Sequence, residues 1–249
     1  MNFHVIATGS SGNCYALEGK SSALILEAGV SPEKVFQQAR FSTRKIAGVV
    51  VTHEHGDHAK FVDRWVKLGF HVYMTPGTRD ALRLGDCRYI VPLKMWNPVP
   101  VGAFFLRPFP VVHDAAEPAG FIIESDESGR ILFATDTGRI DYSFRTGGIR
   151  HLVIEANYAD PLIVDRVRRE EILPAVAKRI RENHLSLDRA AAVVQEHNTA
   201  ALTSVVLIHL SDGNGDPALF REKIAGIAPY ANVYVADKGL LVPFNNSLK

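Results

Sequence analysis

A run of six residues from His53 to His58 constrains this chain more than any other feature. It has the sequence His-Glu-His-Gly-Asp-His and directly follows the apolar run 46–51, which is typical of a buried strand. Three imidazoles and a carboxylate in so short a loop cannot all be satisfied by a hydrophobic core, and they are groups that bind divalent cations. The run therefore predicts a metal site at the end of a strand. A solvated loop rich in histidine is the alternative.

Further histidines and aspartates stand at the ends of other predicted strands. His113 follows the run 110–112, Asp136 follows 131–135, and His209 follows 205–208. Strand ends are where sheets of the α/β type gather ligands from distant parts of the chain. Alone, each of these residues would more often be a hydrogen-bonded loop residue. Together with the six-residue run, they indicate a site for two metal ions.

Short apolar segments rich in Val, Ile and Phe alternate with helical patterns along the chain. Strands are predicted at 3–7, 23–27, 47–52, 71–74, 104–108, 121–124, 131–135, 152–155, 205–209 and 233–236. Helices are predicted at 32–40, 60–68, 78–84, 165–182, 187–197 and 217–227. This alternation indicates sheets covered by helices. The 249 residues, 47% of them hydrophobic, suffice for a single domain over 1–249.

Charge and cysteine content disfavour several classes of protein. A formal net charge of +1 provides no global basic field, although the arginines of 166–169 are either a solvated helix face or a phosphate-contacting surface. Cys14 and Cys87 form no CxxC pair, which argues against a disulfide framework and a thiolate zinc site. Neither a signal-peptide pattern nor a run of about 18 apolar residues occurs, so a cytoplasmic protein without a membrane partner is expected.

The segment THEHGDH at 52–58 resembles the HxHxDH signature of the metallo-β-lactamase fold, and the ligands at the later strand ends follow in that family's order. The resemblance implies an α+β fold, an αβ/βα four-layer sandwich with its site at one edge of two sheets. It also implies two divalent metal ions, with zinc favoured and manganese or iron as alternatives. One ion would be held by His53, His55 and His113, the other by Asp57, His58 and His209, and Asp136 would bridge them.

Two positions refine what this resemblance implies. True β-lactamases commonly have a cysteine where this chain has Asp136, whereas phosphodiesterases and thioesterases of the family have a carboxylate, so a lactam substrate is disfavoured. Glu27 stands where relatives often have an aspartate that contacts the metal ligands from behind. The side chain of Glu27 is longer, so how it adjusts the properties of the ligands stays open, although the site itself does not depend on it. The segment between Asp136 and His209 is too short for a β-CASP domain, so no such insertion is expected.

Six further segments resemble the small YycJ-type (also called WalJ) nucleases of this fold. They are GSSGN at 9–13, VVHDAAEP at 111–118, ATDTG at 134–138, EAN at 155–157, NHLS at 183–186 and HLS at 209–211. The resemblance implies a metal-dependent DNA exonuclease acting 5′ to 3′, in which a hydroxide shared by the two metals attacks phosphorus. Substrate contacts are expected from Ser11, Asn13 and Asn157, and phosphate contacts from the basic residues of 166–169 with Lys178, Arg179 and Arg181.

Glu155 and His184 stand where tRNase Z enzymes of the same fold have a glutamate and a histidine that protonate the leaving oxygen. Hydrolysis of a phosphodiester expels an alkoxide, and an imidazolium held by a carboxylate can give it a proton. By this resemblance Glu155, His184 and the ligand Asp57 are the expected catalytic residues. Alternatively, His184 has only a structural role: it caps or staples the helix that begins near Leu187, with Ser186 as the N-cap.

Two other functions stay open at this point. One is a small-molecule hydrolase on the same fold, either a cyclic phosphodiesterase like PhnP or a thioesterase like glyoxalase II, with a narrow pocket in front of the same metals. The other is a non-catalytic metal-binding partner protein, which the intact ligand set disfavours. The oligomeric state is not determined by the sequence.

Overall fold

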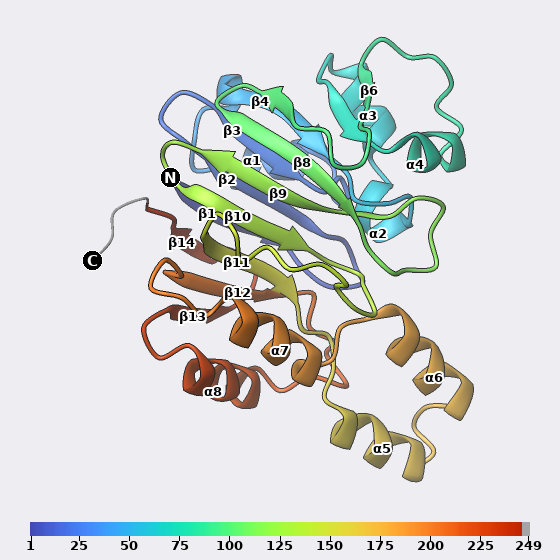
Figure 1. The fold of residues 1–249 in the computed structure, drawn as a ribbon. Helices are drawn as coiled ribbons and strands as arrows, with labels where there is room; N and C mark the ends of the chain where they lie inside the picture. Colours follow the sequence, from blue (N-terminus) through green and yellow to red (C-terminus); the bar gives the residue numbers. More distant parts are fainter. Residues whose placement is uncertain (246–249) are drawn as a thin grey trace.

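Two seven-stranded sheets pack face to face in the computed structural model, which describes residues 1–245 (Figure 1). Sheet A has the order β14-β1-β2-β3-β4-β5-β6, and sheet B has the order β13-β12-β11-β10-β9-β8-β7. Sheet A consists of β1 (Asn2–Ala7), β2 (Cys14–Glu18), β3 (Ala23–Leu26), β4 (Ile46–Val50), β5 (Val72–Met74), β6 (Ile90–Pro92) and β14 (Leu241–Pro243). Sheet B consists of β7 (Val99–Val101), β8 (Phe104–Pro110), β9 (Ala119–Ser125), β10 (Gly129–Ala134), β11 (Ile149–Glu155), β12 (Ser204–Ile208) and β13 (Asn232–Val235).

Helices cover the outer faces of both sheets, which makes the four layers of an αβ/βα sandwich. Val35 of α1 and Trp65 of α3 pack in a buried cluster on sheet A, and Val194 of α7 and Phe220 of α8 pack in another on sheet B. The helices are α1 (Pro32–Gln38), α2 (Gly56–Ala59), α3 (Val62–Lys67), α4 (Pro76–Ala81), α5 (Asp160–Arg168), α6 (Pro174–Asn183), α7 (Leu187–His197) and α8 (Pro217–Ile227). The expected fold class is confirmed. No helix among residues 1–245 is long and apolar enough to span a membrane.

The central core lies between the two sheets and is rich in aromatic side chains. Phe3 stacks on Tyr15 and on Phe244, with ring centroids 5.6 and 5.3 Å apart, and Phe133 of sheet B meets Tyr15 edge to face at 5.9 Å. All four rings are buried. Burial of such a side chain stabilises the fold by about 1.5–3 kcal/mol, so this cluster fixes how the two sheets are placed.

Several helices begin at a side-chain cap that is followed by proline. The side chains of Ser31, Thr75 and Asp216 accept hydrogen bonds from backbone N–H groups in the first turns of α1, α4 and α8, and each is followed by a proline. Ser186 caps α7 by accepting from the N–H of Arg189. These side chains satisfy backbone N–H groups that have no partner within the helix.

The structure differs from the sequence prediction in three respects, and one is the short helix α2, which was not predicted. The single helix predicted at 165–182 is two helices, α5 and α6, because Pro174 starts α6 and Leu173 before it is extended. Strands β2, β6, β7 and β14 were not predicted. The last three are only three residues long and each contains proline, whereas β2 has four buried positions in a row and no alternation.

Parallel pairing directs several strand ends to one edge of the molecule. In sheet A, β3 pairs with β4 in parallel, and in sheet B, β10, β11 and β12 are parallel to one another. Their carboxyl ends are followed by Glu27, His53, Asp136, Ala156 and His209, either directly or within a few residues. Figure 1 shows α5 and α6 set apart from the sheets beside this edge. The edge is therefore where polar side chains of both sheets meet.

Candidate metal centre

The seven residues expected as metal ligands come together at the shared edge of the sheets. They form two clusters, in each of which one potential ligand atom per residue lies within 4.8 Å of all the others. The clusters are His53, His55 and His113, and Asp57, His58, Asp136 and His209. Asp57 and His58 belong to α2, and the other five lie in the loops after β4, β8, β10 and β12. The three histidines of one cluster, and Asp57, His58 and His209 of the other, are grouped as the family resemblance implies, and Asp136 groups with the second cluster.

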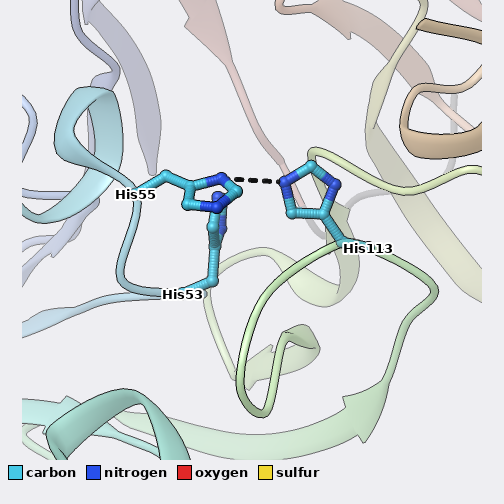
Figure 2. A group of neighbouring side chains, drawn as sticks. All are labelled: His53, His55 and His113. Carbon is cyan, nitrogen blue, oxygen red and sulfur yellow. Dashed lines mark hydrogen bonds between the residues drawn. The ribbon is translucent and has the colours of Figure 1, made fainter. Parts of the chain in front are cut away.

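Three imidazoles make up the first cluster (Figure 2). The Nδ1 atom of His55 lies 3.1 Å from the Nε2 atom of His113. Thr52 Oγ1 lies 2.9 Å from His53 Nδ1, and the carbonyl oxygen of Asn183 accepts from His113 Nδ1 at 3.0 Å. These outer contacts occupy the Nδ1 atoms of His53 and His113, so their Nε2 atoms face the centre, as a metal ligand requires.

The second cluster contains two buried imidazoles, each backed by a glutamate. His58 Nδ1 lies 3.5 Å from Glu27 Oε2, and His209 Nδ1 lies 3.0 Å from Glu155 Oε1. Their Nε2 atoms lie 3.3 and 3.5 Å from Asp57 Oδ2. Glu27 also accepts from the backbone N–H of Thr52 at 3.3 Å. Glu27 therefore lies behind the expected ligand His58, in the supporting position that the family resemblance implies.

Asp136 lies between the two clusters. Its Oδ2 atom is 3.3 Å from His58 Nε2, 3.9 Å from His53 Nε2 and 3.8 Å from His113 Nε2. Its other oxygen, Oδ1, is 3.3 Å from His209 Nδ1 and accepts from the hydroxyl of Thr135 at 2.9 Å. A single carboxylate oxygen faces both clusters, which is the geometry of a bridging ligand.

Backbone strain is concentrated at this edge. Glu27, Asp136 and His209 have φ angles of 69°, 46° and 55°, in the left-handed region that residues other than glycine rarely adopt. Each of the three residues directly follows a strand or comes two residues after it. The chain turns sharply there, so the side chain of each residue points toward the two clusters. Such strain persists where the surroundings impose it, and it is common at functional sites.

Electrostatics divides the histidines into two kinds. Burial lowers the pKa of His53 well below its usual value and lowers that of His113, so both imidazoles are neutral and offer lone pairs. Burial also opposes protonation of His58 and His209, but nearby carboxylates, Asp136 foremost, outweigh it. They raise the pKa of His58 well above its usual range and that of His209 to about 10.

The same observations test whether a metal ion fits these residues. The carboxylates that stabilise protonated His58 and His209 also stabilise other positive charge at this site. A divalent cation that binds there displaces the protons from its imidazole ligands. Within residues 1–245, His53 Nε2, His58 Nδ1 and His209 Nε2 are buried without a hydrogen-bond partner. Buried polar atoms are rarely left unpaired in native proteins. Two of these three atoms face the centre, and the donor set of imidazole and carboxylate suits zinc, manganese or iron.

Glu155 and His184 lie beside the second cluster. Glu155 Oε1 is 2.7 Å from His184 Nδ1, and Glu155 Oε2 accepts from the N–H groups of Thr137 and Leu185 at 3.1 and 2.9 Å. The carboxylate is buried, so burial disfavours its charge, but the charge and hydrogen bond of His184 and the hydrogen bond of His209 lower its pKa. Burial likewise opposes the charge of His184, yet Glu155 raises its pKa. The contact thus favours the carboxylate form of Glu155 and the protonated form of His184.

The three residues expected to contact substrate have different surroundings. Asn13 is fully buried, and its Nδ2 atom lies 3.1 Å from His58 Nε2 and 3.3 Å from Asp57 Oδ2. Asn157 lines the cavity at the centre and donates to the carbonyl oxygen of His209 at 2.9 Å. Ser11 is exposed and does not line this cavity, although its neighbour Ser10 does. Asn13 and Asn157 both contact expected ligands.

A cavity of about 350 Å³ opens onto the centre. One wall comes from α6, which contributes Val176, Arg179 and Ile180. Most basic residues expected to contact phosphate are instead paired with acids: the ion pairs are Arg166–Glu171, Arg169–Asp165, Lys178–Glu182, Arg179–Asp114 and Arg181–Asp160. Of the basic residues in these pairs only Arg179 lines the cavity, so the basic surface that reaches the centre is smaller than that expected from the sequence.

Known proteins share both the sequence pattern and the fold. The family described as "Beta-lactamase superfamily domain" matches residues 24–210. The chain belongs to the metallo-β-lactamase superfamily. It is a hydrolase of this superfamily, with histidine and aspartate groups able to bind metal ions. It is 27% identical over 241 residues to an exodeoxyribonuclease YycJ of Bacillus anthracis, a match that covers 91% of this chain and 89% of that protein.

Solved structures of the superfamily show the same fold. The metallo-β-lactamase fold protein YhfI of Bacillus subtilis superposes with a TM-score of 0.75 at 17% identity, covering 97% of this chain and 98% of that one. A diphosphatase from the PhnP family superposes with a TM-score of 0.68 at 15% identity, covering 100% of this chain and 99% of that one. At these identities the likeness establishes the fold alone.

Sequence reasoning missed two residues that hold the ligands. Asn183 accepts from His113 through its carbonyl oxygen, and its side-chain oxygen accepts from the N–H of Asp114 at 3.0 Å. Thr52 contacts His53 through its hydroxyl. Thr52 adjoins the six-residue run, and a hydroxyl beside a histidine ligand is a signal that could have been used. The contact of Asn183 with His113 depends on how α6 is placed, which no local pattern reveals.

Proposed function

We propose that this chain is a metal-dependent phosphodiesterase that degrades DNA from an end, working 5′ to 3′. The observation that carries the proposal is the contact of 2.7 Å between Glu155 Oε1 and His184 Nδ1 beside the two ligand clusters. A proton donor next to a dinuclear site suits a reaction that expels an alkoxide. The similarity to a protein named exodeoxyribonuclease YycJ supports DNA as the substrate.

Two divalent metal ions are proposed, zinc foremost, with manganese or iron as alternatives. One would be held by His53, His55 and His113, the other by Asp57, His58 and His209, with Asp136 shared between them. When bound, such ions supply Lewis acidity, which activates water and neutralises charge on a phosphoryl oxygen. Glu27 and Asn157 hold ligands in place from behind, whereas Asn13 contacts the Nε2 atom of His58 and the carboxylate of Asp57.

His184 carries the proton that the leaving oxygen needs. Because Glu155 binds Nδ1, the proton to be given away is the one on Nε2, and the side chain is partly exposed where it lines the cavity. After donation the imidazole is neutral and keeps its Nδ1 proton on Glu155. Glu155 is a positioning residue in this scheme, since it acts on the substrate only through His184 and His209.

Degradation of end-labelled DNA tests the proposal. Single-stranded and double-stranded DNA, labelled at the 5′ or the 3′ end, is incubated with Zn²⁺, Mn²⁺ or Mg²⁺. We expect metal-dependent loss of DNA, with a 5′ label released as mononucleotide at the earliest times and a 3′ label retained on shortening strands. Absence of cleavage with every metal would overturn the nuclease assignment, and early release of a 3′ label would overturn the direction.

A small-molecule phosphodiesterase is the second candidate. The cavity of about 350 Å³ falls within the usual range of small-molecule sites, roughly 300–1,000 Å³, and the fold is shared with a diphosphatase of the PhnP family. Cleavage of cyclic nucleotides or nucleotide esters without cleavage of strands would favour it. The Glu155–His184 pair does not support a thioesterase. A thiol has a pKa of about 8.5, so a thiolate leaves without a proton donor.

A further inference from the structure

We propose that an exposed cleft on sheet B, formed by Trp96, Tyr142 and Arg107, binds single-stranded DNA by stacking on its bases. This aromatic cleft lies outside the metal centre, and its assignment to DNA rests on the function proposed above. It has a volume of about 220 Å³, below the usual range for a small-molecule site, so it suits one planar group better than a whole ligand.

Two half-exposed aromatic rings form the mouth of the aromatic cleft. Trp96 and Tyr142 are 43% and 36% exposed, and their ring centroids lie 4.8 Å apart at an interplanar angle of 80°. Phe109 and Phe144 support them from below, with Phe109 fully buried. Exposed aromatic faces on a rigid base are the platforms on which proteins stack successive bases without sequence preference.

The backbone at Trp96 lies in the left-handed region, at the third position of a turn that a hydrogen bond from the N–H of Asn97 to the carbonyl oxygen of Lys94 closes at 3.1 Å. Six residues other than glycine have positive φ among residues 1–245. Glu27, Asp136 and His209 belong to the metal centre, and Arg83 and Glu170 follow the last turns of α4 and α5, where a left-handed residue commonly ends a helix. The remaining one is Trp96, at φ 68°. This turn and a second hydrogen bond, from the N–H of Trp96 to the carbonyl oxygen of Pro108 at 2.8 Å, hold the indole ring at the cleft.

Positive charge accompanies the aromatic rings. Arg107 is exposed, lines the cleft and makes no ion pair or hydrogen bond through its side chain within residues 1–245. Phe105 lies two residues before it on the same face of β8 and is 56% exposed. Arg130 also lines the cleft, although it is paired with Glu124 at 2.8 Å. Alternating arginines and aromatic rings match the phosphates and bases of a single strand.

The aromatic cleft is connected to the metal centre through two short segments. β8 carries Arg107 and leads to His113, and the loop that begins after Asp136 carries Tyr142. At about 3.3 Å per residue, Arg107 lies at most roughly 20 Å from His113. Figure 1 shows β8, β9 and β10 side by side with no helix drawn across them. A strand with one end in the metal centre can therefore reach the cleft.

Tryptophan fluorescence tests the proposal directly, because Trp65 and Trp96 are the two tryptophans of the chain and Trp65 is fully buried. The full-length protein with Zn²⁺ bound is titrated with a twelve-nucleotide oligothymidylate whose phosphorothioate linkages resist hydrolysis. We expect saturable quenching that weakens with salt and disappears in Trp96→Phe. Tyr142→Ala and Arg107→Gln should each raise the apparent Kd about tenfold. Tyr230→Ala, at a tyrosine that is 92% exposed elsewhere, should not.

Several outcomes overturn the proposal. They are an absence of quenching, an unchanged Kd in Tyr142→Ala, and an emission that shifts with protein concentration before DNA is added, which would mark a protein interface. Cleavage of unmodified DNA separates this proposal from the proposed function. If DNA quenches the fluorescence but is never cut, the proposal for the cleft stands and the nuclease assignment is wrong. If wild type and Tyr142→Ala both cut DNA with the same KM for long strands, only the proposal for the cleft is wrong.

Discussion

Glu155 Oε1 lies 2.7 Å from His184 Nδ1, and the same oxygen lies 3.0 Å from His209 Nδ1. One buried carboxylate thus orients both the proposed proton donor and a proposed metal ligand. The parallel register that pairs Glu155 with Ile208 places His209 one residue beyond, at the same edge. The proton donor and the metal site are therefore coupled through Glu155, and a change there should affect both.

Glu155→Gln should weaken metal binding and slow catalysis together. The amide keeps the shape of the side chain but removes the charge that holds two imidazoles. Outer contacts of this kind are typically worth about 10- to 100-fold in metal affinity or activity. Metal affinity by calorimetry and kcat on labelled DNA measure the two effects. Glu182→Gln, at an exposed glutamate of α6, is the matched control and should change neither. Wild-type metal affinity in Glu155→Gln would refute the coupling.

Gly29→Ala should displace the loop that carries the ligands. A Cβ atom at Gly29 would come within 1.8 Å of the carbonyl oxygen of Asp57, whereas one at Gly56 would meet nothing within 4 Å. Overpacking of this kind costs about 1–3 kcal/mol. We expect lower stability to urea and weaker metal binding in Gly29→Ala, and only a small change in Gly56→Ala. Equal behaviour of the two variants would contradict the close packing of the loop.

Removal of metal should abolish hydrolysis and lower the melting temperature. Without cations, the carboxylates of Asp57, Asp136 and Glu155 lie close together among partly protonated imidazoles. Because an ion that binds only the folded state stabilises it, Zn²⁺ at about 100 times its Kd should add about 2.7 kcal/mol. Differential scanning calorimetry after EDTA treatment, and again after Zn²⁺ is restored, measures the change. A melting temperature that is insensitive to both would contradict the site.

His151 should make the fold sensitive to acid, independently of the metal centre. It is buried, stacks on Phe244 at 4.0 Å and contacts Ser204 at 2.6 Å, and burial lowers its pKa from 6.5 to about 3. Because the folded state favours the neutral imidazole, this stabilisation is present above pH 6.5 and is lost as the pH falls from 6.5 toward 3. At pH 5 the loss is about 2 kcal/mol.

Urea unfolding at pH 7.5 and pH 5 measures this effect. Wild type should lose more stability between the two values than His151→Gln, whose side chain is neutral at both. The difference between the two proteins isolates this one imidazole from the other groups that titrate. Parallel losses in wild type and variant would show that His151 is not the cause.

The sequence predicted the metal centre better than its surroundings, for a physical reason. His53 to His58 are neighbours in the chain, and the remaining ligands stand at strand ends that parallel pairing must bring to one edge. The support of His58 by Glu27 also follows from this arrangement. The contact between Asn183 and His113 does not, because it depends on the break at Pro174 and on the packing of α6.

Surface properties were the least predictable. The arginines of 166–169 were compatible with a solvated helix face or a phosphate-contacting surface, and the pairing of Arg166 and Arg169 with acids on the same segment matches the first. Conversely, Trp96 and Tyr142 are far apart in the sequence and meet only because their loops cross the same end of sheet B. Pairing and stacking of side chains depend on tertiary placement, which periodicity does not report. A single domain over 1–249 and a cytoplasmic location stay predictions.

His184→Ala, assayed on two substrates, tests the central claim most directly. Hydrolysis of DNA expels an alkoxide that needs a proton, whereas bis-p-nitrophenyl phosphate expels a phenolate that leaves unaided. With metal content verified, we predict that kcat for DNA falls about 10²- to 10⁴-fold while kcat for the aryl ester changes little. Equal rates for both substrates in wild type and variant, or an equal loss on both, would contradict the role of His184 as the proton donor.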